Sequence, residues 1–291
     1  MLEQLVSIIA PVFICAAIGY AWAQRGKPFK TEMVTHLVTA VGVPCLVFNT
    51  LVNVDIDMSA LGKMAGATFA AIGLMASVGA IILKLWGKSI RAFLPSAVFP
   101  NTGNIGLPLA MLAFGPEGMA LAVAYFTVCI IFQFTLGVAL SAGVMNVQAL
   151  IRVPTIYAMA MAVTFKLMDM PVPAWAGNTI EILSGFTIPL MLITLGVSLQ
   201  QLRVGQFFTS GIVAAMRLLI GFGVGLGVGL AFGFEGQMLG VIVLQSTMPV
   251  AVFNYLFAQR YNTEPEAVAG AVVLSTVFSF ATLPMLMWFV L

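Results

Sequence analysis

The sequence predicts an all-α polytopic membrane protein with ten transmembrane helices, arranged as two inverted halves of five. Apolar residues make up 61% of the 291 residues and charged residues 8%, whereas soluble domains have about 45–50% and about 25%. The apolar residues form ten runs long enough to span a bilayer, and proline positions in the first five runs recur in the last five. This composition excludes a soluble enzyme and a disordered chain, and the net charge of +2 without a basic cluster excludes a nucleic-acid partner.

The ten runs follow one another closely along the chain. Charged residues, prolines or glycines separate them, and every connection is too short to hold a soluble domain. The runs lie at residues 5–23, 33–53, 60–83, 92–114, 118–141, 150–168, 177–198, 212–233, 236–258 and 265–290.

Basic residues gather in the odd-numbered loops. Lys63 and Lys166 are the two at even-numbered loops. Because cytoplasmic loops carry the excess of Lys and Arg, this distribution predicts a multi-pass protein of the plasma (inner) membrane with both termini outside. The nine basic residues of the odd loops are Arg25, Lys27, Lys30, Lys84, Lys88, Arg91, Arg152, Arg203 and Arg260.

A weak internal repeat relates the two halves, residues 1–141 and 150–291. Pro11 and Pro28 bracket the first run with the same 17-residue separation as Pro154 and Pro171 around the sixth. Since five spans are an odd number, a second copy would enter the membrane from the opposite face, as in inverted-repeat carriers. The alternative is a chance alignment of prolines. Further positions recur after 149 residues: Pro100, Pro116, Glu117, Thr127 and Val128 correspond to Pro249, Pro265, Glu266, Thr276 and Val277.

The fourth run cannot be a continuous lipid-facing helix. Residues 99–108 read Phe-Pro-Asn-Thr-Gly-Asn-Ile-Gly-Leu-Pro, and each proline removes a backbone donor and disrupts the preceding turn. Such backbone is tolerated at membrane depth only inside protein or beside a wet cavity. Pro100 lies nine residues after Arg91, about 13 Å along a helix, which is close to half of a ~30 Å bilayer core.

The ninth run has a matching break at Pro249, within residues 245–254 (Gln-Ser-Thr-Met-Pro-Val-Ala-Val-Phe-Asn), also near mid-depth. The two broken helices run in opposite senses and are expected to cross. Each break starts a half-helix whose first amides and positive dipole end favour an anion.

Polar side chains at the breaks add neutral donors and acceptors, and they are the predicted substrate-binding residues. The alternative is that they only satisfy their own kinked backbone. The predicted binding residues are Asn101, Thr102, Asn104, Ser246, Thr247 and Asn254, and the predicted crossover residues are Pro100, Gly103, Pro108 and Pro249.

The motif at residues 99–108, followed by Phe114 and Gly115, closely resembles the fourth-span motif of the auxin efflux carrier family. Residues 43–48 (Val-Pro-Cys-Leu-Val-Phe) and 255–261 (Tyr-Leu-Phe-Ala-Gln-Arg-Tyr) are similar to that family too. The family includes plant auxin exporters and bacterial carriers associated with malonate, malate or related organic anions.

This resemblance covers essentially all ten runs and carries further expectations. It implies a transport domain of spans 3–5 and 8–10 in which spans 4 and 9 cross, and a scaffold domain of spans 1, 2, 6 and 7 that is often dimeric. It places binding at Pro100, Asn101 and Pro249, and with them Asn49 and Gln133. Plant members join their halves by a long hydrophilic loop, whereas here residues 142–149 make the connection, so a short bacterial-type anion carrier fits better than an auxin carrier.

Other polar residues leave alternatives open. Asn49 and Gln133 lie inside spans, where they either bind substrate or join helices by a hydrogen bond. Arg217, near the start of the eighth run, is expected to reach the cytoplasmic surface, the alternative being a carboxylate ligand in the cavity. His36 is an interfacial histidine or a pH-responsive group. The glycine-rich eighth run predicts close helix packing.

The leading hypothesis is thus a secondary transporter that moves a small organic anion by alternating access. The alternatives are a sodium-coupled symporter of the bile-acid type and, remotely, an intramembrane enzyme, for which no nucleophile–base pair or carboxylate pair is evident. No cofactor or metal is expected, because Cys15, Cys45 and Cys129 lack paired spacing; the coupling ion, Na⁺ or H⁺ if any, stays open.

Overall fold

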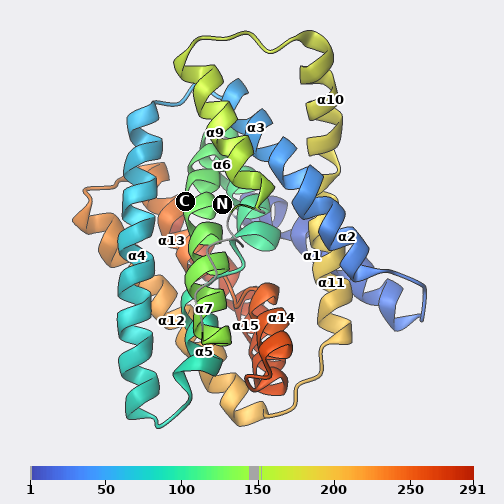
Figure 1. The fold of residues 1–291 in the computed structure, drawn as a ribbon, viewed down its shortest axis with the longest axis vertical. Coiled ribbons are helices and arrows are strands. Elements are labelled where there is room, and N and C mark those ends of the chain that lie inside the picture. Colours follow the sequence, from blue (N-terminus) through green and yellow to red (C-terminus); the bar gives the residue numbers. More distant parts are fainter. Residues whose placement is uncertain (1, 144–150, 152) are drawn as a thin grey trace.

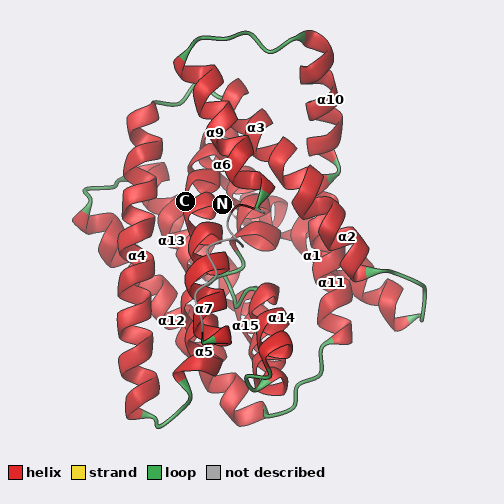
Figure 2. Ribbon diagram, in the orientation of Figure 1, coloured by secondary structure: helices red, strands yellow, loops and turns green. Residues whose placement is uncertain are grey.

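The computed structural model describes residues 2–143, 151 and 153–291, and in this part of the chain every regular element is a helix (Figure 2). The first half contains α1 (Leu2–Gln24), α2 (Thr31–Leu37), η1 (Val38–Gly42), α3 (Val43–Asn53), α4 (Met58–Leu85), α5 (Ile90–Val98), η2 (Thr102–Gly106), α6 (Leu107–Phe132), η3 (Gln133–Gly137) and α7 (Val138–Ala142). The second half contains α9 (Pro154–Leu167), α10 (Ala174–Gly185), α11 (Thr187–Gln201), α12 (Phe207–Ala231), α13 (Gly236–Thr247), α14 (Val252–Tyr261) and α15 (Pro265–Val290).

Seven helical stretches of the described residues are long and apolar enough to cross a membrane. They are Leu5–Gln24, Thr31–Asn53, Met58–Leu85, Thr102–Ala142, Ala174–Gln201, Phe207–Ala231 and Pro265–Val290. The difference from ten has a physical reason: the breaks leave α5, α13 and α14 with 9, 12 and 10 residues, and α9 has 14. Ten spans and the inverted repeat therefore stay predictions.

Helix starts and bends follow local chemistry. Asp57 caps α4 by accepting from the backbone N–H of Ser59 (2.9 Å), and Ser89 caps α5 by accepting from that of Ala92 (3.3 Å). Within α6, Gly115 has a positive φ of 65° and bends the helix just before Pro116. The predicted fourth and fifth runs meet at this bend. The connection predicted at 142–149 lies largely outside the described residues.

The helices form two sets, and the helices within each set pack against one another (Figure 1). In one set α1 lies against α11, and α3 lies against α9 and α10. In the other, α12 lies against α4, α13 and α15, and α6 lies against α4 and α13. The α12–α13 contact uses the glycine face predicted for close packing: side chains or backbone of α13 occupy the space beside Gly221, Gly225 and Gly229.

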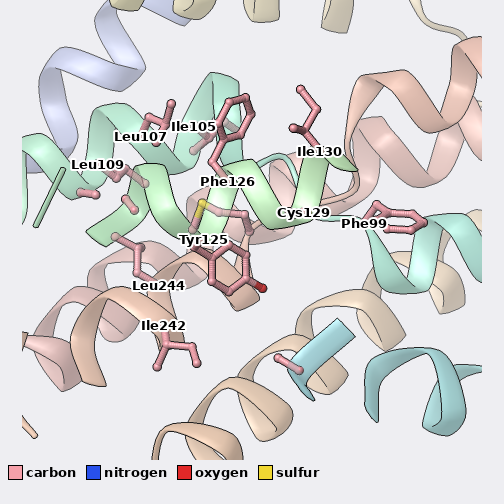
Figure 3. Packing of buried hydrophobic residues seen from close by; sticks show 14 of the residues in the cluster. Phe99, Ile105, Leu107, Leu109, Tyr125, Phe126, Cys129, Ile130, Ile242 and Leu244 are labelled. Atoms are coloured by element: carbon pink, nitrogen blue, oxygen red, sulfur yellow. The ribbon is translucent and has the colours of Figure 1, made fainter. Parts of the chain in front are cut away.

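The main hydrophobic core includes residues at both breaks, among them Phe99 and Met248. Figure 3 shows buried apolar side chains of α6 and α13 in the same cluster as Phe99 and Ile105. Tyr125, Phe99 and Leu107 are fully buried in this cluster. The core thus fixes the position of both interrupted segments.

Candidate functional site

The two breaks lie in direct contact. After α5 ends at Val98 and α13 ends at Thr247, both chains are extended and form an antiparallel bridge between Pro100 and Val250. The N–H of Asn101 donates to the carbonyl oxygen of Pro249 (2.7 Å), and the N–H of Ala251 donates to that of Phe99 (3.2 Å). The interruptions therefore satisfy part of each other's backbone, which a lone break in a lipid-facing helix could not do.

The C-terminal ends of the two half-helices are capped by side chains. Arg217 of α12 donates from Nη1 to the carbonyl oxygens of Ala97 (2.5 Å) and Val98 (2.8 Å), and from Nη2 to that of Ser246. Asn254 donates from Nδ2 to the carbonyl oxygens of Pro95 (3.2 Å) and Phe99 (3.1 Å). Arg217 thus supplies donors to the carbonyl oxygens at the ends of α5 and α13. Asn254 adds a second donor to two carbonyl oxygens that already accept from the backbone N–H groups of Phe99 and Ala251.

The expectation that Arg217 reaches the cytoplasmic surface is wrong. Its side chain is fully buried (0% exposed) and turned toward the crossing. The physical reason is a tertiary contact, because the carbonyl oxygens at the ends of α5 and α13 offer acceptors to the guanidinium inside the protein. The position of a long side chain along a predicted span does not show whether it points to the membrane surface or into the protein.

At the N-terminal end of η2, Asn101 carries a free donor. Its Oδ1 accepts from the backbone N–H of Asn104 (3.3 Å), which caps the new helix. Its Nδ2 is buried and has no partner. Asn101 is 5% exposed, so the arrangement leaves an amide N–H₂ group available inside the protein. The side chain of Asn104 is half-buried beside it.

Gln245, in the last turn of α13, was not among the predicted binding residues. It is fully buried, and neither Oε1 nor Nε2 has a partner. Its side chain lies against the backbone of Gly106 so closely that a Cβ there would collide with Oε1. Its position four residues before Pro249 was the available signal in the sequence.

Other predicted residues take structural positions near the crossing. The Ser246 hydroxyl hydrogen-bonds the Tyr125 hydroxyl (3.0 Å), and the Thr247 hydroxyl donates to the carbonyl oxygen of Val243 within its own helix (2.7 Å). Gln133 donates from Nε2 to Oδ1 of Asn254 (3.3 Å). Of the two readings of Gln133, this contact supplies the interhelical hydrogen bond.

The remaining predicted residues divide between the crossing and elsewhere. Thr102 is buried at the start of η2, and Gly103 packs beside Phe126 and Met191. Pro108 is the second residue of α6, which follows η2 directly.

Asn49 makes its contacts away from the two breaks. It donates to the Ser184 hydroxyl of α10 (3.4 Å), accepts from Asn53 (2.8 Å), and lines a small pocket between α3 and α10.

A buried cation and unpartnered amides at the crossing of two interrupted helices are typical of membrane transporters. Residues 5–147 and 140–287 match the family described as membrane transport protein. The chain belongs to this family, and the resemblance to auxin efflux carriers is confirmed. It is a multi-pass membrane transporter.

Archaeal and plant relatives agree with this assignment. An uncharacterized transporter of Methanothermobacter thermautotrophicus is 26% identical over 95% of each chain, and one of Methanocaldococcus jannaschii is 22% identical over 98% of each. Auxin efflux carrier component 1 of Arabidopsis thaliana is 27% identical over 45% of this chain and 22% of its own length.

Proposed function

We propose that this transporter moves a small organic anion, a carboxylate, and binds it at the crossing of the two interrupted helices. One observation carries the proposal: the negative ends of α5 and α13 are capped by Arg217 and Asn254, while Asn101 Nδ2 has no partner. The first amides of η2–α6 and α14 and their positive dipole ends then favour a negative ligand. The guanidinium adds a fixed positive charge close to the same place.

The predicted binding set extends around this centre. We propose Asn101, Asn104 and the newly found Gln245 as direct contacts. Asn101 Nδ2 and both polar side-chain atoms of Gln245 are buried without a partner, and Asn104 lies half-buried beside Asn101. Thr102, Ser246, Thr247, Asn254 and Gln133 support them from the same cluster. Asn49 is a contact only if the substrate passes the α3–α10 pocket.

For transport we propose alternating access between two moving bodies. The scaffold comprises spans 1, 2, 6 and 7 (α1, α2–α3, α9 and α10–α11), and the transport domain comprises the rest. The packing of α1 with α11 and of α3 with α9 supports this division. The further proposals are ten spans in a 5+5 inverted repeat, both termini outside the plasma membrane, and a homodimer through the scaffold.

A short bacterial-type anion carrier fits better than an auxin carrier. The archaeal relatives match along nearly their whole length, whereas the plant carrier is matched over 22% of its length. The comparisons favour this family over a bile-acid-type symporter, and the relatives are named as transporters rather than enzymes.

Uptake into proteoliposomes tests the proposal. Mono- and dicarboxylates are offered with and without sodium, proton and potential gradients. At least one carboxylate should enter saturably, and Asn101→Ala should reduce its flux by about tenfold, the effect of losing about 1.4 kcal/mol of binding. Asn178→Ala, at an exposed asparagine of α10, is the matched control. Saturable uptake of cations or neutral solutes but no carboxylate, or normal flux in folded Asn101→Ala, would overturn it.

A further inference from the structure

Arg217 is a buried cation whose acceptors are all neutral in the part of the chain that the structure describes. Nη1 donates to the carbonyl oxygens of Ala97 and Val98, and Nη2 to that of Ser246 and to the Met75 sulfur (3.3 Å). The side chain is 0% exposed. A buried ionised group ordinarily requires an opposite charge or a dense set of dipoles, and here the dipoles come from two helix ends.

The two helix ends need a positive charge between them. Each C-terminus carries a partial negative charge and unpaired carbonyl oxygens. When α5 and α13 bring such ends together inside an apolar core, the ends repel each other and their oxygens lack donors. Main-chain carbonyls at broken helices are also the ligands with which many transporters hold a sodium ion.

The neighbouring backbone is shaped around this guanidinium. Gly221 lies one turn after Arg217 on α12, and a Cβ at this position would collide with both the Ser246 carbonyl oxygen and Arg217 Nη2. Gly225, one turn further, faces the Ser246 side chain, with 2.7 Å between its ideal Cβ position and Ser246 Cβ. The glycines therefore allow α13 to come close enough for Arg217 to join its end to that of α5.

We propose that Arg217 is a tethered cation that takes the place of a bound metal ion between the C-terminal ends of α5 and α13. It acts as a positioning residue that holds the two interrupted helices in register, and it removes the need for sodium at this point. Its effect on flux rests on the proposed anion transport, whereas its effect on the folded protein does not.

Thermal unfolding of the purified full-length protein in detergent tests the inference without any transported substrate. The wild type should show the same midpoint in sodium, methylguanidinium and choline chloride at equal ionic strength. Arg217→Ala leaves a cavity beside the carbonyls, so its midpoint should fall and should recover in part with methylguanidinium or sodium but not with choline. Arg203→Ala, at an exposed arginine, should show neither the fall nor the recovery.

If Arg217→Ala does not fold, the comparison of Arg217→Lys with Arg217→Met decides. Lysine keeps a charge but loses the planar fork, while methionine has a similar length and no charge. The lysine variant should unfold at the higher temperature. Equal midpoints for lysine and methionine, or an alanine variant that no small cation stabilises, would overturn the inference, as would a sodium-specific stabilisation of the wild type.

A transport assay gives the second readout. Carboxylate flux in the wild type should not depend on sodium, and flux lost in Arg217→Ala should return at least severalfold with methylguanidinium inside and outside the vesicles. Absence of carboxylate flux in the wild type would refute the proposed function alone, because the unfolding measurements would still decide the role of Arg217.

Discussion

Two buried amide side chains at the crossing hold hydrogen-bonding groups without partners. Asn101 keeps Nδ2 free, and Gln245 keeps both Oε1 and Nε2 free. Leaving a buried polar group unpaired costs about 1–3 kcal/mol. A site that binds a polar ligand recovers this cost when the ligand arrives, so these groups are where ligand contacts are expected.

Gln245→Met should separate folding from transport. Methionine has a similar length and no unsatisfied polar atoms, so the free energy of unfolding should stay unchanged or rise by about 1 kcal/mol. Carboxylate flux should fall by tenfold or more, because the ligand loses a donor and an acceptor. Thermal unfolding and proteoliposome uptake check the two effects. Gln206→Met, at the exposed N-cap of α12, serves as control, and a destabilised variant with normal flux would contradict the prediction.

Sequence reasoning reached some of these residues but not their roles. The composition of residues 99–108 was sufficient to locate Asn101, because proline, glycine and asparagine mark broken backbone. Asn254 was predicted to contact ligand, and its side chain donates to carbonyl oxygens at the end of α5, a role that the sequence does not indicate. The directions of the Arg217 and Gln245 side chains could not be predicted, because the direction of a long side chain depends on its tertiary neighbours. These neighbours are the carbonyl oxygens of Ala97, Val98 and Ser246 for Arg217, and the backbone of Gly106 for Gln245.

At the scale of elements, the contact between η2 and α13 depends on a missing side chain. Gly106 ends η2, and the Gln245 side chain fills the space that a Cβ would need. Gly106→Ala should therefore lower the unfolding midpoint, by the equivalent of about 1–3 kcal/mol, as overpacking does, and reduce flux. The double variant Gly106→Ala/Gln245→Ala should regain stability because it removes the collision.

The control for this pair is Gly73→Ala on α4, where nothing lies within 4 Å of the added methyl group. Since alanine is the better helix former, its midpoint should be unchanged or raised. If Gly106→Ala were as stable as Gly73→Ala, the prediction that an added methyl group at Gly106 collides with the Gln245 side chain would be wrong.

The start of α4 gives a pH-dependent prediction. The hydroxyl and backbone N–H of Ser59 donate to the Asp57 carboxylate (2.6 and 2.9 Å) and lower its pKa below the usual value. A lowered folded-state pKa stabilises the protein at neutral pH, and the effect disappears as pH falls through that pKa. Asp57→Ala should therefore lower the unfolding midpoint slightly at pH 7 and not in acid, whereas Asp55→Ala should leave it unchanged at both.

The elements could be predicted better than their internal irregularities. Long apolar runs set the continuous spans such as α4, α12 and α15, because hydrophobic length is a property of local sequence. The π-helical turns η1 and η3 carry no matching local signal. One of them, η3, begins at Gln133, whose side chain donates to Asn254 of α14.

At the scale of the whole molecule, the proposed inverted repeat leads us to expect that the two breaks meet. Residues 99–101 pair with residues 249–251, and this pairing contains Pro100 and Pro249, the two prolines that the 149-residue offset relates. The spacing of the prolines suggests that the two breaks lie together. It does not predict the hydrogen bonds that stabilise them, because Arg217 of α12 and Asn254 of α14 donate to carbonyl oxygens of a different helix, α5. In the proposed alternating access, the transport domain that holds this crossing moves against the scaffold.

A cross-link between the two bodies should stop that movement. Phe13 of α1 and Phe280 of α15 lie with ring centroids 4.2 Å apart, across the proposed boundary. In a background with Cys15, Cys45 and Cys129 replaced by alanine, Phe13→Cys/Phe280→Cys joined by a short bis-methanethiosulfonate reagent should lose most carboxylate flux and regain it when a reductant cleaves the link.

The matched control lies within one body. Phe222 of α12 and Phe289 of α15 are a similar pair, with centroids 5.5 Å apart. Because both helices belong to the proposed transport domain, linking Phe222→Cys to Phe289→Cys should leave flux nearly unchanged. Full flux with the first pair completely linked would show that α1 and α15 move together, and the boundary between the two bodies would have to be drawn elsewhere.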